Sequence, residues 1–317
     1  MKKYLDRARV SKNDEFYTRL EDIEDELKHY DLSGKVVYCN CDDPHKSNFV
    51  KYFIDNFNEL GINRLYATHY TPDEGLLCKN DEKPNFMLEY DGSYKYSVLL
   101  GDGDFRSDEC VDILKRCDVV VTNPPFSLFR EFVDLIMSHK KDFLVIGNQN
   151  AITYKEFFPL LKDDIVRLGV CRNKTIHFSI PCAYYAGKNS YVENGITYAG
   201  VPAITWFTTL HHDVPTKPLK LTKTYNEKDY PKYDNYNAIN VDRVKDIPKD
   251  YNGLIGVPIT FMNKHNSNQF EIHGTRRWCK SDEVVKAYRG DRGSAHDDMK
   301  VLIDGKEMYD RIFIKRK

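Results

Sequence analysis

Short apolar runs alternate with amphipathic stretches over the first two-thirds of the chain. Runs rich in β-branched and aromatic residues predict strands at residues 36–38, 64–67, 119–121 and 143–146. Residues 21–28, 47–60, 108–115 and 128–137 carry apolar positions at helical spacing. Strands and helices that alternate in this way predict a doubly wound, Rossmann-like α/β domain with a largely parallel sheet.

The regular pattern ends near residue 213. Two further strands are predicted at residues 175–180 and 203–209. The Tyr-, Gly- and Asn-rich stretch between them, residues 184–200, predicts an excursion of the chain or a hairpin. Beyond them Pro, Lys, Tyr and Asn become frequent and periodicity weakens. We therefore predict a catalytic domain at residues 1–212 and a target-recognition region at residues 213–317.

The strand predicted at residues 119–121 runs into Thr122 and then Asn123-Pro124-Pro125-Phe126. Proline has no backbone N–H and a fixed φ, so the strand stops there and the tetrapeptide lies at its carboxyl end. Open α/β sheets bind their ligands at that edge. The acceptors left in place are the amide oxygen of Asn123 and the carbonyl oxygen of Pro124.

Two fixed acceptors suit the methylation of an amine. The lone pair of an exocyclic nucleobase amine is delocalised into the ring, and gripping both N–H bonds would localise it and aim it at an electrophilic methyl group. Phe126 offers a flat apolar surface on which an extruded base could stack. The plainer interpretation is a strand-to-loop turn with a buried Phe. We predict an amino-group methyltransferase site at Asn123, Pro124, Pro125 and Phe126.

A methyl donor must lie beside Asn123, and S-adenosyl-L-methionine is the obvious candidate. The first strand is followed by Asn40, Cys41, Asp42 and Asp43, whose carboxylates could meet the donor's ammonium or ribose hydroxyls. Asp42 and Asp43 would equally suit a helix cap or a turn. No Gly-x-Gly-x-x-Gly occurs here, and a donor without phosphates needs none.

Two other segments could complete the donor pocket. In the loop at residues 101–106, Asp102 and Asp104 supply carboxylates, Asp104 could accept from an adenine amine, and Phe105 could cover the ring; a turn with solvated carboxylates is the alternative. Near the N-terminus, Phe16, Tyr17 and Thr18 could fold over the donor, or Thr18 could cap the helix that follows.

The bulk composition sets wider limits. With 317 residues, 41% hydrophobic and 30% charged, the chain is typical of a globular protein of one or two domains. It has no run of 18 apolar residues and no signal-peptide core, which predicts a cytoplasmic protein with no membrane contact. Its eight cysteines show no metal-ligand spacing and are expected to be reduced, mostly buried and without a metal.

A formal net charge of −1 does not by itself indicate a nucleic-acid partner. DNA binding would therefore need a local basic face. The candidates are Lys217, Lys220, Lys223, Arg311, Lys315, Arg316 and Lys317. A solvated basic surface is the alternative.

Several segments together resemble one family. They are residues 14–18, 36–44, 101–107, 120–131, 152–156, 230–236 and 256–261. These motifs, spread over most of the chain, resemble the EcoRI-type adenine-specific DNA methyltransferases, with the cofactor segments, Asn-Pro-Pro-Phe and target recognition in the gamma order. The resemblance implies transfer from S-adenosyl-L-methionine to adenine N6 in double-stranded DNA, with the target base flipped out.

The resemblance also implies roles for particular residues. Phe16, Tyr17 and Thr18 would cover the methionine end of the donor, residues 40–43 would line its pocket, and Asp104 with Phe105 would hold its adenine. Trp206 would lie near the flipped base, although a core Trp fits equally well. A monomer suffices for one transfer per site, and a restriction endonuclease acting on the same DNA site is a possible partner.

The chain departs from the family pattern at two places. Its second strand ends in Ala67-Thr68-His69 without the acidic residue that usually binds ribose, and residues 171–178 do not match. In the recognition region, six residues suit base edges and phosphates, or ordinary surface loops: Tyr233, Asn235, Tyr236, Asn237, Arg276 and Arg277. The alternatives for function are methylation of cytosine N4, an RNA base or a protein glutamine, and a catalytically inert DNA-binding protein.

Overall fold

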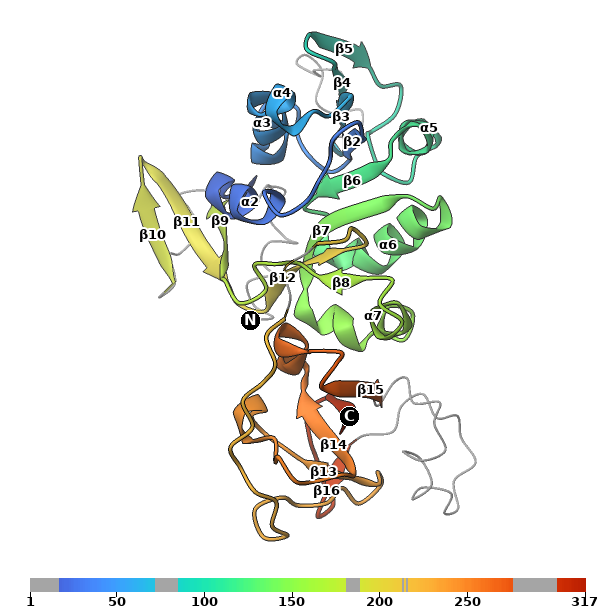
Figure 1. Ribbon diagram of the computed structural model, residues 1–317. Helices are drawn as coiled ribbons and strands as arrows, with labels where there is room; N and C mark the ends of the chain where they lie inside the picture. The colour runs from blue at the N-terminus through green and yellow to red at the C-terminus, as the bar shows by residue number, and fades with distance from the viewer. Residues whose placement is uncertain (1–16, 72–84, 181–188, 213, 215, 276–300) are drawn as a thin grey trace. The chain divides into compact units, whose positions relative to one another are not determined.

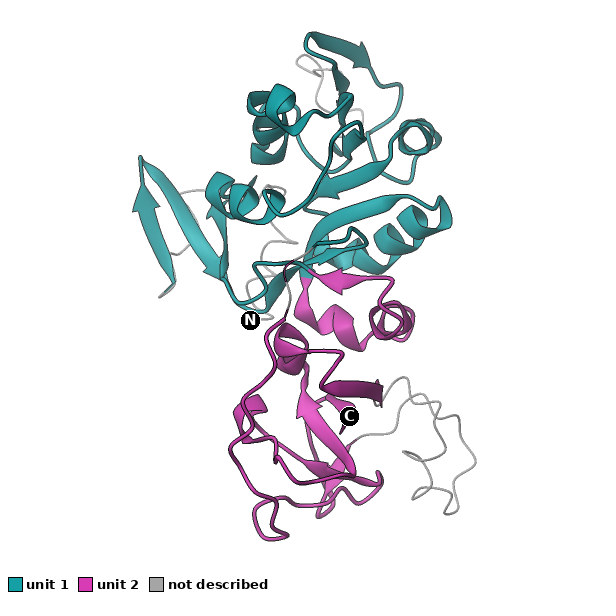
Figure 2. Cartoon of the chain, viewed as in Figure 1, with its two compact units in different colours: residues 1–147, 169–212 teal, residues 148–168, 213–317 magenta. Residues whose placement is uncertain are grey.

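The computed structural model describes residues 17–71, 85–180, 189–212, 214, 216–275 and 301–317. The chain forms two compact units (Figure 2). Unit 1 comprises residues 1–147 and 169–212, and unit 2 comprises residues 148–168 and 213–317. The chain thus enters unit 2 once, at residues 148–168, before the boundary predicted near residue 213.

Unit 1 contains the predicted alternation of strands and helices (Figure 1). Its elements are β1 (Tyr17–Thr18), α2 (Leu20–Leu27), β2 (Val36–Cys39), α3 (Asn48–Asp55), α4 (Phe57–Leu60), β3 (Arg64–Ala67), β4 (Phe86–Tyr90), β5 (Tyr94–Val98), α5 (Asp108–Arg116), β6 (Val119–Thr122), the 3-10 turn η1 (Phe126–Leu128), α6 (Phe129–Ser138), β7 (Asp142–Asn148), β9 (Ile176–Ile180), β10 (Ser190–Glu193), β11 (Ile196–Val201) and β12 (Ile204–Thr208).

The main sheet of unit 1 runs in the order β5-β4-β3-β2-β6-β7-β12. β3, β2, β6 and β7 are parallel neighbours, with Val37 paired to both Leu65 and Val119. In Figure 1, α2, α3 and α4 lie on one side of this sheet and α5 and α6 on the other. All four residues of β6 are buried, as a central strand covered on both faces requires. The sheet therefore presents the carboxyl ends of four parallel strands along one edge.

The structure differs from the sequence prediction at one helix and one hairpin. The helix expected at residues 47–60 is interrupted at Asn56, whose φ of −109° and ψ of 15° end α3 before α4 begins. The antiparallel hairpin of β4 and β5 was not predicted. All five residues of β5 are exposed, although its sequence alternates apolar residues (Tyr94, Tyr96, Val98) with polar ones (Lys95, Ser97).

A second sheet of unit 1 runs in the order β1-β9-β11-β10. The hairpin predicted within residues 184–200 is confirmed as β10 and β11, which pair antiparallel around Asn194 and Gly195. These two residues have φ of 50° and 80°, the left-handed pair that a tight hairpin turn requires. β1 pairs with β9, so Tyr17 and Thr18 form a strand. Thr18 therefore does not cap α2, whose N-cap residue is Arg19.

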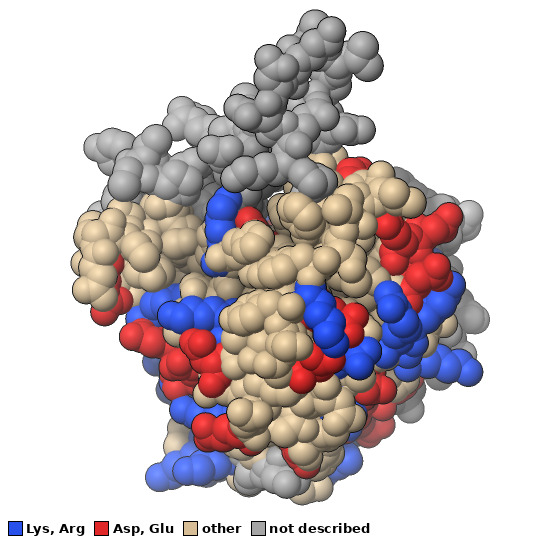
Figure 3. Space-filling view, turned by 90° about the horizontal axis from the view of Figure 1, so that it is seen from above, with Lys and Arg blue, Asp and Glu red and all other residues tan. Residues whose placement is uncertain are grey.

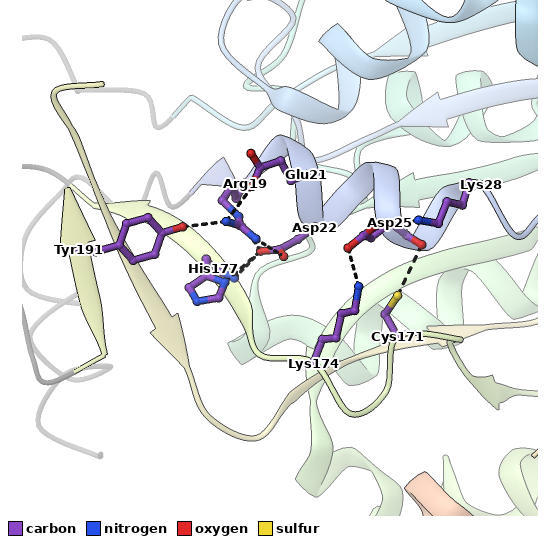
Figure 4. A network of polar contacts seen from close by, with 9 residues as sticks. All are labelled: Arg19, Glu21, Asp22, Asp25, Lys28, Cys171, Lys174, His177 and Tyr191. Carbon is purple, nitrogen blue, oxygen red and sulfur yellow. Dashed lines mark hydrogen bonds and ion pairs between the residues drawn. The ribbon is translucent and has the colours of Figure 1, made fainter. Parts of the chain in front are cut away.

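Acidic side chains of α2 fasten the helix to β9 and to the segment that leads into it (Figure 4). Asp22 accepts from the guanidinium of Arg19 at 2.9 Å and from the backbone N–H of His177 at 2.8 Å. Asp25 pairs with Lys174 at 2.6 Å, which lowers the pKa of Asp25 to about 2. These contacts fix residues 174–177, part of the stretch whose sequence departs from the family pattern.

Unit 2 is built around a smaller sheet in the order β13-β14-β18-β15. Its elements are the 3-10 turns η2 (Gln149–Thr153), η3 (Val244–Asp246) and η4 (Ile259–Lys264), the helix α7 (Phe158–Lys162), and the strands β8 (Arg167–Leu168), β13 (Ala238–Asn240), β14 (Leu254–Pro258), β15 (Phe270–Thr275), β16 (Leu302–Ile303), β17 (Lys306–Glu307) and β18 (Arg311–Arg316). Gln149 donates to Asn263 Oδ1 at 2.8 Å, which ties η2 to η4. Tyr236 stacks on Phe313 in the core.

The described cysteines Cys39, Cys110 and Cys117 are buried, Cys41 and Cys171 are half-buried, and all five are free thiols. Burial raises the pKa of the Cys117 thiol to about 12, so that thiol is protonated near neutral pH. Among the residues that the structure describes, no helix has the length and apolar content needed to cross a bilayer.

Candidate active site

The site predicted from the sequence gathers where β3, β2 and β6 end. The loop after β2 is joined to the end of β3, because Asp42 donates its N–H to the carbonyl of Thr68 at 2.9 Å and Thr68 donates to the carbonyl of Cys39 at 3.1 Å. The loop after β6 begins at Asn123. Since these strands are parallel neighbours, the candidate donor-binding residues 40–43 and the candidate catalytic residues 123–126 lie at the same edge of the sheet.

The Asn-Pro-Pro-Phe loop has a well-defined conformation. Pro125 has φ of −57° and ψ of 120° and precedes η1, and the N–H of Leu128 donates to the carbonyl of Pro125 at 3.0 Å. Asn123 and Phe126 are half-buried, Pro124 is buried and Pro125 is exposed. Phe126 packs against the hydrophobic core of unit 1 and remains partly accessible.

The helix after this loop is held close to β7. A Cβ atom at Gly147 would lie 2.5 Å from the ring of Phe129, so only glycine allows this approach. Phe129 also packs against Phe207, with ring centroids 5.6 Å apart. The start of α6, and with it the end of the Asn-Pro-Pro-Phe loop, is therefore fixed against the sheet.

Asp42 binds two hydroxyl groups. Its side chain is 6% exposed; Oδ1 accepts from Ser47 Oγ at 2.6 Å and Oδ2 accepts from Thr122 Oγ1 at 2.5 Å. Ser47 Oγ in turn accepts from the N–H of Phe49 at 3.1 Å and caps α3. Burial raises the pKa of Asp42 to about 6. Asp43 forms the turn into α3, accepting from the N–H of His45 at 2.8 Å.

Thr122 and Ser47 were missed as site residues from the sequence. Ser47 carries the usual signal of an N-cap, a Ser directly before a helical pattern. Thr122 carries no signal except its place next to Asn123, because its partner lies 80 residues away along the chain.

Two buried oxygens are available for a ligand. Asn40 Oδ1 and Thr18 Oγ1 have no hydrogen-bond partner in the described part of the chain, and both residues are 2% exposed. Asn48 donates to the carbonyl of Thr18 at 2.7 Å, which places β1 beside the start of α3. Unsatisfied buried acceptors are costly unless a ligand with donors satisfies them. Both atoms fit a ligand that carries an ammonium group and hydroxyls.

The loop at residues 101–106 is shaped by its own contacts. Gly103 has φ of 76°, and a Cβ there would lie 2.1 Å from the carbonyl oxygen of His69. Asp102 accepts from the N–H of Asp104 at 3.0 Å. The Asp104 carboxylate pairs with Arg106 at 2.7 Å, which lowers its pKa. Phe105 is buried with its ring centroid 5.2 Å from that of Phe132. The structure thus places this loop beside the segment that follows β3, with several of its acceptor positions already in use.

Trp206 lies in the core of unit 1. Its side chain is 1% exposed and packs edge-on against Phe49, with centroids 5.9 Å apart. This burial favours the interpretation of Trp206 as a core residue over that of a base-contacting one.

Three of the residues expected to read DNA are buried in unit 2. Tyr233 donates to Asn240 Oδ1 at 2.7 Å, Asn235 accepts from the N–H of Leu302 at 3.2 Å, and Tyr236 stacks on Phe313 at 4.6 Å. Their burial favours a structural role for all three. Phe16, Arg276 and Arg277 lie outside the described residues.

The expected basic face is smaller than the sequence suggests. Arg311 is 4% exposed and pairs with Asp242 at 3.0 Å, so it belongs to the interior and not to a DNA-facing surface. On the face of the molecule shown in Figure 3, Lys and Arg side chains are interspersed with Asp and Glu. In the described part of the chain, no ion pair involves the other six candidates: Lys217, Lys220, Lys223, Lys315, Arg316 and Lys317.

Two of these six cations line a surface hollow of about 450 Å³ in unit 2. Pro218, Leu219, Leu221, Asn266, Asn268, Gln269, Arg316 and Lys317 form its walls. Gln269 holds the hollow together: its side chain accepts from Leu219 N at 2.7 Å and donates to Leu219 O at 2.8 Å. The N–H of Lys317 donates to the carbonyl of Gln269 at 3.0 Å. Lys217 directly precedes the lining segment, Lys220 lies within it between Leu219 and Leu221, and both are exposed.

The raised pKa of Asp42 predicts a pH dependence of stability. A carboxyl group whose pKa is higher in the folded than in the unfolded protein binds protons preferentially when folded, so its stabilising contribution is lost as pH rises from about 4 to about 6. The loss is on the order of 3 kcal/mol. Urea unfolding of the protein and of Asp42→Asn at pH 4.5 and pH 7 should show a smaller fall in the variant. An equal fall in both proteins would assign the pH dependence to other groups.

Comparison with known proteins identifies the chain. A mixed α/β sheet with Asn-Pro-Pro-Phe at the end of a central parallel strand fits a methyltransferase. The family described as "Adenine-specific methyltransferase EcoRI" matches residues 4–317. The chain therefore belongs to this family, which confirms the resemblance seen in its motifs, and it is an adenine-specific DNA methyltransferase.

Curated relatives cover the same length. The chain is 44% identical to the Type II methyltransferase M.EcoRI of Escherichia coli over 99% of this chain and 97% of the relative. It is 37% identical to the Type II methyltransferase M.MpnI of Mycoplasma pneumoniae, over 99% and 98% of the two chains. It is 36% identical to M.MgeORF184P of Mycoplasma genitalium, over the same shares. No solved structure matches the chain.

Proposed function

We propose that the chain transfers a methyl group from S-adenosyl-L-methionine to N6 of an adenine flipped out of double-stranded DNA. The observation that carries this proposal is the Asn-Pro-Pro-Phe loop at the buried end of β6, beside the loop that follows β2. The parallel strands with helices on both sides support a Rossmann-like methyltransferase sheet, in which donor and acceptor meet at the carboxyl edge.

In this proposal Asn123 and Pro124 act on the target amine. Asn123 Oδ1 and the Pro124 carbonyl accept the two N–H bonds of N6, which localises the lone pair and aims it at the donor. The two prolines hold this geometry because neither can rotate about φ or donate a competing backbone hydrogen bond. Phe126 stacks on the flipped adenine with its accessible surface. Catalysis then comes from orientation and fixed dipoles, without a covalent intermediate.

The donor pocket is proposed to lie over the ends of β2 and β3. S-adenosyl-L-methionine, when bound, supplies an electrophilic methyl group. Asn40 Oδ1 and Thr18 Oγ1 would accept from its ammonium or hydroxyl groups, because both are buried and otherwise unsatisfied. Tyr17 and Phe16 would cover the methionine end, Cys41 and Asp43 would line the pocket, and the residues of the 101–106 loop, Asp102, Asp104 and Phe105, would border the adenine.

The proposal is tested by methyl transfer from labelled S-adenosyl-L-methionine to unmodified plasmid DNA, followed by nucleoside mass spectrometry. N6-methyladenine as the labelled product is expected. N4-methylcytosine, or label that enters RNA or protein and not DNA, would contradict it. The sequence-specific form of the activity would suit a restriction-modification system, in which a monomer acts alongside an endonuclease for the same site.

Unit 2 is proposed to contact the DNA backbone. The hollow bordered by Arg316 and Lys317, with Lys217 and Lys220 beside it, presents cations with no carboxylate partner among the described residues. Phosphate contacts of this kind contribute affinity that does not depend on sequence and falls with salt. Arg276 and Arg277 are proposed to add to the same contacts.

Replacing Arg316 and Lys317 with Gln is expected to weaken DNA binding about equally for cognate and non-cognate duplexes. The slope of log affinity against log salt should fall by about 1 for each phosphate that is no longer neutralised. Fluorescence anisotropy at several salt concentrations measures both quantities. Lys115→Gln is the matched control, because Lys115 in unit 1 is paired with Asp112 at 2.8 Å. Equal salt slopes in the unchanged protein, in the variant with both Arg316 and Lys317 replaced and in Lys115→Gln would exclude the hollow from the DNA contact.

A further inference from the structure

One side-chain contact connects the two halves of the active site. The loop after β2 reaches the end of β6 through the Asp42 carboxylate, which accepts from Thr122 Oγ1 at 2.5 Å and from Ser47 Oγ at 2.6 Å. Thr122 is the last residue of β6 and directly precedes Asn123. Ser47 caps α3, the helix whose Asn48 also holds β1.

We propose that Asp42 is a positioning residue for methyl transfer, which fixes Thr122 and thereby the backbone that carries Asn123. Asp42 does not touch the target amine in this proposal. It sets the distance and angle between the acceptor row at residues 123–124 and the donor side of the site, because the same carboxylate is anchored to the start of α3.

The local backbone explains why such an anchor is needed. Beyond Thr122 the chain leaves the sheet, and Pro124 and Pro125 have no N–H with which to hold their own position. The fixed points on either side are Thr122 before the loop and the Leu128 N–H to Pro125 carbonyl bond after it. A displacement on the order of 1 Å at a reacting group costs about a hundredfold in rate.

The partners of Asp42 account for both of its oxygens. The carboxylate is buried, each oxygen accepts from one hydroxyl, and its backbone N–H is bound to the carbonyl of Thr68. Of the groups around it, Asp43 repels its charge and the thiols of Cys39 and Cys41 remain neutral because burial raises their pKa values. The described surroundings therefore direct the carboxylate to Ser47 and Thr122, in place of the donor contact expected from the sequence.

The test compares Thr122→Val, which removes the hydroxyl and keeps the shape, with Asp42→Asn. In Asp42→Asn the amide can still accept from one hydroxyl and donate to the other. In single-turnover methyl transfer, Thr122→Val should be slower by about 10- to 100-fold, while the Kd values for S-adenosyl-L-methionine and for DNA change less than about threefold. Asp42→Asn should retain most of the rate, and Asp42→Ala should lose as much as Thr122→Val.

Thr208→Val is the matched control. Thr208 lies in β12 of the same sheet, is 0% exposed, and donates its hydroxyl to the carbonyl of Phe143 at 2.8 Å, away from the Asn-Pro-Pro-Phe loop. If buried Thr hydroxyls had only a structural role, Thr122→Val and Thr208→Val would slow methyl transfer by the same factor. That result would overturn the proposal. A normal rate in Thr122→Val would overturn it as well.

A double substitution tests whether Asp42 and Thr122 act through the hydrogen bond between them. Asp42→Ala with Thr122→Val should be no slower than Thr122→Val alone, because both changes remove the same hydrogen bond. Multiplicative effects on the rate would show that the two residues act independently and would contradict the proposal.

The inference about Asp42 rests on the proposed catalytic role of Asn123, and different results would contradict each of them. An active Asn123→Ala would remove the catalytic assignment, whereas an inactive Asn123→Ala with a normal Thr122→Val would remove only the positioning role of Asp42.

Discussion

Asn123→Ala is expected to lower the turnover of methyl transfer by about a hundredfold or more, with S-adenosyl-L-methionine binding nearly unchanged. The substitution removes the side-chain acceptor that would hold one N–H of the target amine and leaves the Pro124 carbonyl in place. The lone pair of N6 would then be neither localised nor aimed. Because the missing hydrogen bond acts on the methyl acceptor, the donor's Kd should hold, and the effect should appear in the rate of the chemical step.

Single-turnover assays with saturating donor and duplex DNA measure this rate, and calorimetric titration measures donor binding. Asn63→Ala is a suitable control, because Asn63 is exposed and its amide donates to the carbonyl of Gly34 at 2.6 Å, outside the site. That variant should keep the full rate. Turnover that is unchanged in Asn123→Ala would remove Asn123 from the mechanism.

The central strands and the catalytic loop could be predicted from the sequence because their signals are local. β6 is a β-branched run that ends at two prolines, and both the burial and the position of the loop follow from that pattern. The β4 and β5 hairpin was missed although its signals are also local: Asp91-Gly92 is a turn sequence, and Tyr94, Tyr96 and Val98 alternate with Lys95 and Ser97.

The roles of polar residues were harder to predict than the elements that carry them. Asp42 was expected to face a ligand, but its oxygens accept from Ser47 and Thr122; the partner of one oxygen comes from a strand 80 residues later. Arg311 was expected on a basic surface, but its side chain is buried and is bound by the buried Asn240 and the exposed Asp242. A residue type shows what a side chain can bind, whereas the tertiary fold decides which partner it meets.

The same limit applies to the aromatic and amide residues of unit 2. Tyr233 and Asn235 suit base edges by type, yet both are buried. A Cβ at Gly256 would lie 2.4 Å from the hydroxyl of Tyr233, so that ring is packed directly on β14. The lysines around residues 217–220 give the opposite case, since their exposure leaves them available to DNA.

Glu26→Ala is expected to reduce the free energy of unfolding by on the order of 3 kcal/mol, which is a large part of the stability of a typical domain. Glu26 is 0% exposed and accepts three hydrogen bonds: from Tyr30 Oη at 2.6 Å, from Val170 N at 2.7 Å and from Cys171 N at 2.7 Å. The substitution leaves these three donors buried without an acceptor. The cost stays below three full desolvation penalties because a buried charge is removed at the same time.

Urea unfolding at pH 7 measures this difference, and Glu24→Ala is the matched control, since Glu24 lies on the same helix with an exposed side chain. Its stability should change by less than about 0.5 kcal/mol. Tyr30→Phe removes one donor and keeps the acceptor, so its stability should fall by about 1 kcal/mol. Equal stabilities of Glu26→Ala and Glu24→Ala would mean that water replaces the carboxylate without cost.

The consequence of removing Glu26 should reach the donor side of the site. Its carboxylate fixes α2 to residues 170–171, and Asp22 and Asp25 fix the same helix to His177 and Lys174. β1 precedes α2 directly and pairs with β9, the strand that contains His177. Under conditions in which the variant is still folded, Glu26→Ala is therefore expected to weaken S-adenosyl-L-methionine binding more than it slows the chemical step. This is the reverse of the effect expected for Asn123→Ala. A variant of reduced stability that bound the donor normally would show that β1 keeps its position without α2, and would separate the fold of this segment from its proposed role over the donor.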